Sequence, residues 1–109
     1  MFEMMYDAAV KWDADTVICS YTETNEWDKS TQTNKGFDHG LMPENIVLNP
    51  SSIPMFLTSF VGAPWNKLFL RKMIEENGLR FSNTRIVNDE FFVTAAMTCT
   101  KRQIGRAHV

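Results

Sequence analysis

Cysteine and histidine are scarce in this sequence, and their scarcity excludes several classes of protein. The 109 residues include two cysteines and two histidines. Cys19 and Cys99 lie far apart and form no CxxC pair, so neither a disulfide scaffold nor a zinc ribbon fits. His39 and His108 lack the spacing of paired metal ligands. We therefore expect two buried, reduced thiols and no metal site made by this chain alone.

Long apolar runs, basic clusters and glycine-rich loops are also missing. No stretch approaches the roughly 20 continuous apolar residues of a membrane-spanning helix, so we expect no membrane span. The N-terminal residues show no signal-peptide pattern. No run of Lys and Arg with interleaved aromatic residues occurs, which argues against a nucleic-acid partner. A glycine-rich loop that could hold a phosphate is absent as well.

What remains is the composition of a single globular domain with an uneven charge. Apolar residues make up 44% of the chain and charged residues 22%, which argues against disorder. Residues 1–54 contain nine acidic residues and three lysines, a balance of −6. Residues 55–109 contain four acidic and eight basic residues, a balance of +4. A basic half can attract phosphate-bearing partners, although a solvated helix face explains each single residue better.

The first half of the chain predicts a helix, a strand and a long polar connection. Residues Met1–Trp12 predict a helix with one apolar face, made by Phe2, Met5, Ala9 and Trp12. The β-branched run Thr16–Tyr21 predicts a buried strand. Residues Thr22–Pro50 are polar except for Ile46–Leu48, and predict an irregular excursion with at most one short strand.

The second half predicts helices with recognisable ends. Ser51 or Ser52 caps a short apolar helix that ends before Gly62. Residues Trp65–Phe69 predict an extended piece, and Leu70–Asn77 a helix that stops at Gly78. Asn88 is the predicted cap of a last helix, which runs to about Cys99 and carries this apolar stripe: Phe91, Phe92, Ala95, Ala96 and Cys99.

Both ends of the chain have unusual sequence features. The predicted first helix begins at Met1 with no residue to cap its free N–H groups. The last six residues, Ile104–Val109 (IGRAHV), match the translation of a common short-read sequencing adapter. We therefore expect residues 1–103 to be the native part, truncated at both ends, and residues 104–109 to be a non-native tail.

Three segments resemble those of family 2 glycosyltransferases. They are Pro64–Phe69 (PWNKLF), Glu76–Phe81 (ENGLRF) and Asn88–Phe92 (NDEFF), in the order and at about the spacings found in that family. The upstream piece Tyr6–Tyr21, an amphipathic helix that leads into DADTVICSY, resembles the segment after the family's acidic metal-binding motif. The resemblance covers most of residues 1–100, and residues 22–50 are unmatched in detail.

The resemblance implies an α/β fold: a partial GT-A-like nucleotide-diphospho-sugar transferase fold, with an incomplete mixed sheet and flanking helices. Residues 1–103 would form the C-terminal, acceptor-side part of the catalytic domain. The implied reaction is inverting transfer of a sugar from a nucleotide-sugar donor to a hydroxyl of a carbohydrate or lipid-linked acceptor. The implied setting is surface polysaccharide synthesis in the cytoplasm, at the inner face of the membrane.

The implied donor and its metal ion, Mg²⁺ or Mn²⁺, would be bound by a motif that this chain lacks. We therefore expect the parent protein to be the enzyme, and the chain alone to bind neither donor nor metal and to be inactive. The alternative interpretation is a small, non-catalytic α/β binding or interaction module. A degenerate, non-catalytic member of the family is a third possibility, since Asn88 stands where the family usually has Glu.

The resemblance implies that Asp89 is the general base. Inverting transfer needs a carboxylate that takes the proton of the acceptor hydroxyl. The first turn of a helix stabilises the ionised form of such a group. Glu90 is the rival, and it points about 100° away around the helix. Plain helix capping is the alternative explanation for Asp89.

Trp65, Asn66 and Lys67 match the family segment beside the active-site cleft, which makes them candidate substrate-binding residues. The Trp ring could stack on a sugar, Asn could hydrogen-bond hydroxyls, and Lys could neutralise phosphate. The alternative is structural, with Trp65 anchored in the core and Asn66 bracing the loop.

Overall fold

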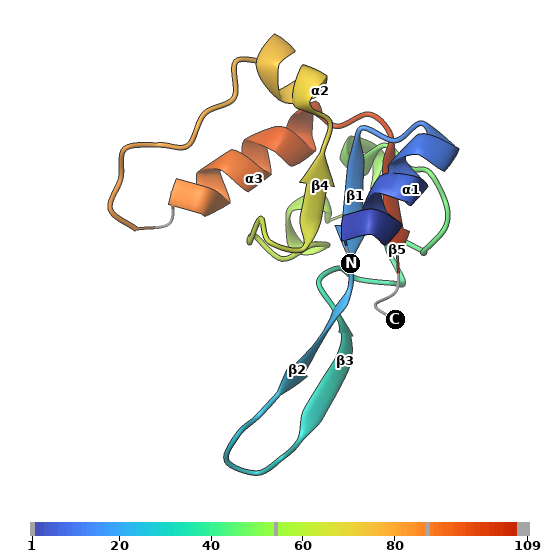
Figure 1. Cartoon of the computed structure of the whole chain (residues 1–109). Coiled ribbons are helices and arrows are strands. Elements are labelled where there is room, and N and C mark those ends of the chain that lie inside the picture. The colour runs from blue at the N-terminus through green and yellow to red at the C-terminus, as the bar shows by residue number, and fades with distance from the viewer. Residues whose placement is uncertain (1, 54, 87, 107–109) are drawn as a thin grey trace.

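The chain folds into a mixed α/β domain with a projecting hairpin (Figure 1). The computed structural model describes residues 2–53, 55–86 and 88–106. Within these residues, a three-stranded sheet has the order β4-β1-β5, and a two-stranded sheet pairs β2 with β3. None of the helices in this described part has the length and hydrophobicity to cross a bilayer.

The central strand β1 (Thr16–Cys19) is covered on both faces, and its four residues are fully buried. It runs antiparallel to β4 (Lys67–Phe69) and parallel to β5 (Gln103–Arg106), which makes the sheet mixed. Val17 is the residue opposite both Leu68 and Ile104. The strand predicted at this position is thus confirmed, because a β-branched apolar run suits a strand enclosed from both sides.

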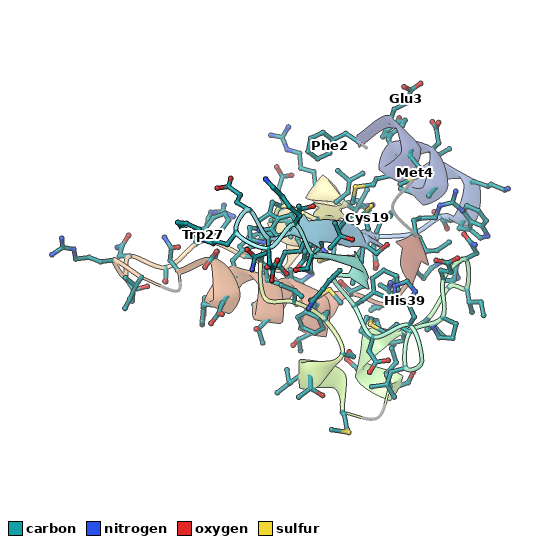
Figure 2. All side chains as sticks on the ribbon, turned by 90° about the horizontal axis from the view of Figure 1, so that it is seen from below. Phe2, Glu3, Met4, Cys19, Trp27 and His39 are labelled. Atoms are coloured by element: carbon teal, nitrogen blue, oxygen red, sulfur yellow. The ribbon has the colours of Figure 1, made fainter. Side chains whose placement is uncertain are left out.

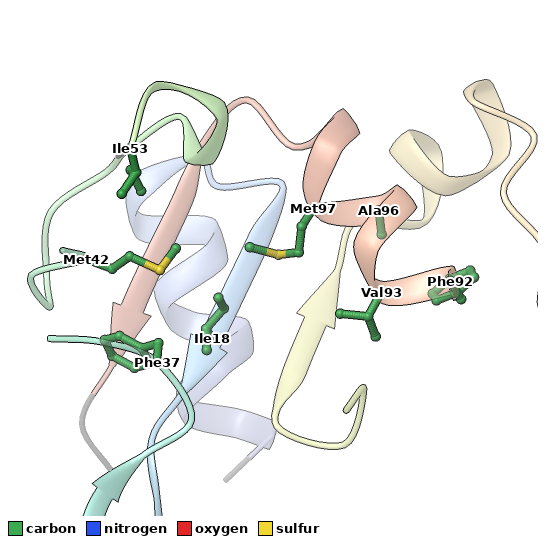
Figure 3. Close-up of a cluster of buried hydrophobic side chains, with 8 residues drawn as sticks. All are labelled: Ile18, Phe37, Met42, Ile53, Phe92, Val93, Ala96 and Met97. Carbon is green, nitrogen blue, oxygen red and sulfur yellow. The ribbon is translucent and has the colours of Figure 1, made fainter. Parts of the chain in front are cut away.

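Two apolar clusters sandwich the sheet. On one face, α1 (Phe2–Trp12) packs Met5 and Ala8 against Val17 and Ile104. On the other face, α3 (Asn88–Cys99) and the loops after the hairpin form a second cluster (Figure 3), which contains Ile18, Phe37, Met42, Ile53, Phe92, Val93, Ala96 and Met97. Alternate residues of β1 point to opposite clusters, as strand geometry requires.

The limits of α3 were predicted correctly, but its buried face was not. Val93 and Met97 are fully buried, whereas Phe91 is 63% exposed and Cys99 is half-buried. Helix α1 shows a similar difference, since Phe2 is 64% exposed. Apolar residues occur around most of α3, so periodicity alone cannot choose its face, and packing on the sheet decides. The prediction of two buried thiols therefore holds only for Cys19, whose pKa is raised by burial.

Residues 22–50 contain a hairpin that was not predicted. Strand β2 (Tyr21–Thr24) pairs antiparallel with β3 (Thr31–Lys35). The apolar island Ile46–Leu48 contributes a single bridge, from Leu48 to Gln103. Both hairpin strands are built from polar residues, so no alternation of apolar and polar residues marks them.

The helix predicted after Ser51 is replaced by two short 3₁₀ turns, η1 (Pro50–Ser52) and η2 (Phe56–Thr58). Asn49 caps η1, because its Oδ1 accepts a hydrogen bond from the Ser51 N–H at 3.1 Å. Pro suits the first position after such a cap. Pro54, which would be tolerated in the first turn of the predicted helix, lies outside the described residues.

The remaining predicted elements are close to the observed ones. Strand β4 lies inside the predicted extended piece, and α2 (Arg71–Glu76) lies inside the predicted helix. Gly78 follows α2 with φ +62°, the left-handed conformation expected of a glycine at a helix end.

The structure describes only part of each end of the chain, and part of the C-terminal end belongs to the sheet. Met1 and residues 107–109, which include His108, lie outside the described residues. Residues 104–106, in contrast, belong to β5, and Ile104 is fully buried against α1. A β-branched residue at this position completes the core whatever its origin, so the non-native origin of residues 104–109 stays a prediction.

Candidate functional site

The candidate site lies where the loop before β4 meets the first turn of α3. A Cβ atom placed on Gly62 would lie 3.2 Å from Cγ of Glu90, so the Glu90 side chain rests on the backbone of this loop. The loop continues into Trp65, Asn66 and Lys67. All three glycosyltransferase-like segments are neighbours in the fold, although they are separate in the sequence, because the Phe92 ring meets Phe69 edge to face and stacks on Phe81, with centroids 6.0 Å and 4.3 Å apart.

Asp89 and Glu90 occupy the first turn of α3 and differ in their surroundings. Asp89 is half-buried, and its Oδ1 accepts a hydrogen bond from the Glu90 N–H at 2.9 Å. This bond satisfies one of the free N–H groups at the helix start, as the capping explanation expects. Glu90 is exposed and carries the contact with Gly62. Both carboxylates gain from the positive end of the helix dipole.

Lys67 is buried and braces the loop. Only 5% of the residue is exposed. Its Nζ donates to the carbonyl oxygens of Val61 and Ala63, each at 2.5 Å, and to Oδ1 of Asn66 at 2.8 Å. These bonds engage the three donors of an ammonium group. Burial lowers the pKa of Lys67 to about 7. The contact with phosphate implied by the resemblance stays a prediction, and this geometry favours a structural role.

Asn66 ties the loop to the end of β1. It is 1% exposed, and its Nδ2 donates to the Cys19 carbonyl oxygen at 2.9 Å. The Cys19 N–H donates in return to the Asn66 carbonyl oxygen, also at 2.9 Å. Gly36, the residue after β3, packs on this pair so closely that a Cβ there would lie 2.7 Å from Asn66 Nδ2. The bracing interpretation of Asn66 therefore fits its surroundings.

Trp65 is the accessible member of the segment. The residue is 53% exposed, so it is no core anchor. Its ring meets that of Tyr21 edge to face, with centroids 4.6 Å apart and planes at 64°. Tyr21 begins β2, so the contact links the loop to the hairpin. An exposed indole held by a second aromatic ring has the geometry needed to stack on a flat, apolar ligand face.

Sequence reasoning missed Tyr21 and Gly36 as parts of this region. The sequence pattern predicts Tyr21 as the end of a buried strand, and only the observed break after Cys19 turns it toward Trp65. Gly36 carries φ +115°, a conformation that favours glycine, but one glycine in a polar stretch is no signal of a close approach.

Within the described residues, the His, Cys, Asp and Glu side chains form no group of three or more that could hold a metal ion. The chain matches no family model, and no curated protein is significantly similar to it. The resemblance to family 2 glycosyltransferases therefore rests on the short segments alone.

Proposed function

We propose that this chain forms the acceptor-side part of the catalytic domain of an inverting glycosyltransferase, with Asp89 as the general base. The observation that carries the proposal is the contact of Glu90 with Gly62, which puts the acidic segment NDEFF beside the loop that leads into PWNKLF. Segments that cooperate in one reaction must meet in the fold, and Phe92 of this segment also meets Phe69 of PWNKLF edge to face, with ring centroids 6.0 Å apart.

In the proposed reaction, this chain takes up one proton, from the acceptor hydroxyl. The acceptor hydroxyl oxygen attacks the anomeric carbon of the nucleotide-sugar, and the Asp89 carboxylate takes the hydroxyl proton. The bond from the anomeric carbon to the diphosphate breaks at the opposite face, and the nucleoside diphosphate leaves with the electron pair. Because the hydroxyl oxygen attacks the face of the anomeric carbon opposite the leaving diphosphate, the configuration of the sugar is inverted.

The other candidate residues divide into one contact residue and two positioning residues. Trp65 would stack on the acceptor or on the transferred sugar, since its ring is exposed beside Tyr21. Asn66 and Lys67 would act through the loop, because their polar atoms bind Cys19, Val61 and Ala63. The donor and its Mg²⁺ or Mn²⁺ belong in this proposal to other parts of the parent protein. That protein would act at the cytoplasmic face of the membrane in surface polysaccharide synthesis.

The alternative, a non-catalytic binding module, is favoured by the same buried contacts. Asn66 and Lys67 are engaged in bracing, and Asp89 forms a hydrogen bond within its own helix. A module that only binds a partner requires nothing more of these residues. The two functions differ in whether the Asp89 carboxylate is needed for turnover.

The deciding experiment begins with the coding DNA beyond both ends of this sequence. The complete reading frame is expressed, and release of nucleoside diphosphate from a set of nucleotide-sugars is measured with lipid-linked and soluble acceptors. We expect Asp89→Asn to lower turnover about 100-fold to 10,000-fold, the usual contribution of a general base. The matched variant Glu90→Gln should stay within about tenfold of the parent. Equal losses in both variants, or a larger loss in Glu90→Gln, would contradict the assignment. A reading frame confined to these residues and lacking turnover would favour the binding module.

A further inference from the structure

The hairpin β2–β3 projects from the body of the domain and ends in an exposed tryptophan (Figures 1 and 2). Trp27, in the turn between the two strands, is 96% exposed. A tryptophan gains free energy from leaving water, so one displayed at the end of a projecting element is a candidate for contact with a ligand.

The turn that carries Trp27 has a defined shape. The Asn25 N–H donates to the Ser30 carbonyl oxygen at 2.8 Å, which closes the turn. Asn25 Oδ1 accepts a hydrogen bond from the Trp27 N–H, and Asp28 Oδ1 accepts one from the Ser30 N–H, both at 2.9 Å. Bonds from Ser30 also lower the pKa of Asp28. The backbone that carries the indole is therefore fixed by local hydrogen bonds, which reduces the entropy lost on binding.

A polar hollow of about 390 Å³ lies next to this turn, along the hairpin. Four residues line it: Glu23, Asn25, Ser30 and Gln32. They belong to one face, because Glu23 is opposite Gln32 in the ladder and residues two apart on a strand point the same way. A carboxylate, two carboxamides and a hydroxyl supply both donors and acceptors. Asn25 joins the hollow to the tip, since it also bonds the backbone of Trp27.

We propose that this face of the hairpin binds a saccharide, with Trp27 stacked on a sugar ring and the hollow receiving hydroxyl groups. Sugars combine an apolar ring face with many neutral hydroxyls, and the hairpin presents an exposed indole in a turn whose residues Asn25 and Ser30 also line the polar hollow. The choice of ligand class rests on the proposed function, in which the natural ligand is the acceptor.

The charges around Trp27 disfavour two other kinds of ligand that an exposed tryptophan could contact, nucleic acids and lipid membranes. The turn residues Glu26, Asp28 and Lys29 sum to −1, and Glu23 in the hollow adds another negative charge. A phosphate backbone or an anionic lipid surface would be repelled. Insertion into a bilayer would desolvate the two turn carboxylates, which is costly.

Binding is measured on the whole 109-residue chain labelled with ¹⁵N, through the indole N–H signal of Trp27. The probes are tetrasaccharides of glucose, N-acetylglucosamine, mannose and rhamnose, each raised to about 20 mM, which covers the millimolar affinity of a small exposed site. We expect at least one probe to shift this signal saturably. The Gln32→Ala variant should weaken that binding at least fivefold. The Thr31→Ala variant, altered on the opposite face of the same strand, should stay within twofold.

Each contrary result overturns the inference. No saturable shift of Trp27 with any probe excludes a saccharide site, as does a shift that Gln32→Ala leaves unchanged. Vesicles of phosphatidylcholine and phosphatidylglycerol are tested in parallel, and loss of the Trp27 indole N–H signal with vesicles alone would assign the hairpin to a membrane. Turnover by the complete reading frame is a separate measurement. Saccharide binding without turnover would contradict the proposed glycosyltransferase function and support the saccharide site on the hairpin. Turnover without binding at Trp27 would contradict only the saccharide site.

Discussion

The loop before β4 and the hairpin β2–β3 begin near the same point, the end of β1, but are built in opposite ways. In the loop, Asn66 and Lys67 are buried, and their polar atoms bind backbone carbonyl groups. In the hairpin, the polar side chains of residues 22–32 face solvent and Trp27 stands at the tip. Polar residues thus have two distinct uses here. Buried ones fix the backbone of the loop inside the fold, and exposed ones lie where a ligand can reach them.

The two regions are joined at Gly36, so a substitution there should have the largest effect on stability. A Cβ at Gly36 would lie 2.7 Å from Asn66 Nδ2 and 2.9 Å from the Cys19 carbonyl oxygen, and φ is +115°. Gly36→Ala combines a clash with backbone strain, so we expect it to lower the free energy of unfolding by about 3 kcal/mol or more. Urea denaturation of the chain measures this change.

Gly78→Ala is the matched control for Gly36→Ala. Gly78 also has a positive φ, +62°, but a Cβ there would meet no atom within 4 Å. We expect a loss of about 1 kcal/mol from backbone strain alone. Equal losses at the two glycines would show that the close approach at Gly36 contributes nothing, and the junction between loop and hairpin would then be unimportant for stability.

The buried ammonium group of Lys67, in the loop before β4, predicts that the stability of the protein depends on pH. Its pKa falls from the ordinary value of 10.5 to about 7 on folding. The unfolded chain therefore binds more protons between these two values, and the free energy of unfolding rises with pH across that window. Relative to Lys67→Met, which lacks the titrating group, we expect the wild type to gain about 2 kcal/mol between pH 7 and about pH 9.

Denaturation midpoints of both proteins across this pH range test the prediction. Lys72→Met is the control, because Lys72 is exposed on α2 and its ammonium group pairs with Glu76 on the surface. Its difference from the wild type should change by less than about 0.5 kcal/mol over the same range. If the difference in free energy of unfolding between wild type and Lys67→Met does not change with pH, the buried ammonium group keeps its proton. The three oxygen acceptors around it would then stabilise the charged form.

Some elements of the fold could be predicted from the sequence and others could not. The limits of α3, the buried strand β1 and the glycine after α2 follow from local patterns of apolar residues and helix ends. The hairpin could not be predicted, since both its faces are polar and the period of two is visible only against an apolar face. The burial of Lys67 depends on carbonyl groups that the fold brings to it. From the sequence alone, a single lysine is expected to be exposed.

The candidate site was predicted in part. Trp65 to Lys67 and Asp89 were identified from their resemblance to family segments, and the loop and the helix start do meet, through Gly62 and Glu90. The different roles within the segment were not foreseeable, because they depend on which side chain points inward. Asn66 and Lys67 point into the fold, and Trp65 points to solvent beside Tyr21.

The contact between Trp65 and Tyr21 is the weaker link between loop and hairpin. An edge-to-face pair contributes about 0.5–1.5 kcal/mol, and Trp65 is half-exposed. A double-mutant cycle of Trp65→Ala and Tyr21→Leu should therefore give a coupling energy of about 1 kcal/mol in the free energy of unfolding. The same cycle with Trp65→Ala and Trp27→Ala should give none within error, because Trp27 lies at the far end of the hairpin. Coupling in the second cycle would mean that the hairpin and the loop respond as one unit.

Trp27→Ala should have the smallest effect of all on stability. The residue is 96% exposed, so its removal takes almost no buried apolar surface from the fold, and we expect a change within about 0.5 kcal/mol. Urea denaturation is again the measurement, with Trp65→Ala as the reference for a tryptophan that has a packing partner. A loss above about 1 kcal/mol would mean that the indole packs on the hairpin in solution, and the tip would then be part of the fold. A change near zero would show that the indole stabilises nothing in its own chain, in contrast to the buried Asn66 and Lys67 of the loop, and any role of Trp27 would then lie in contacts outside the fold.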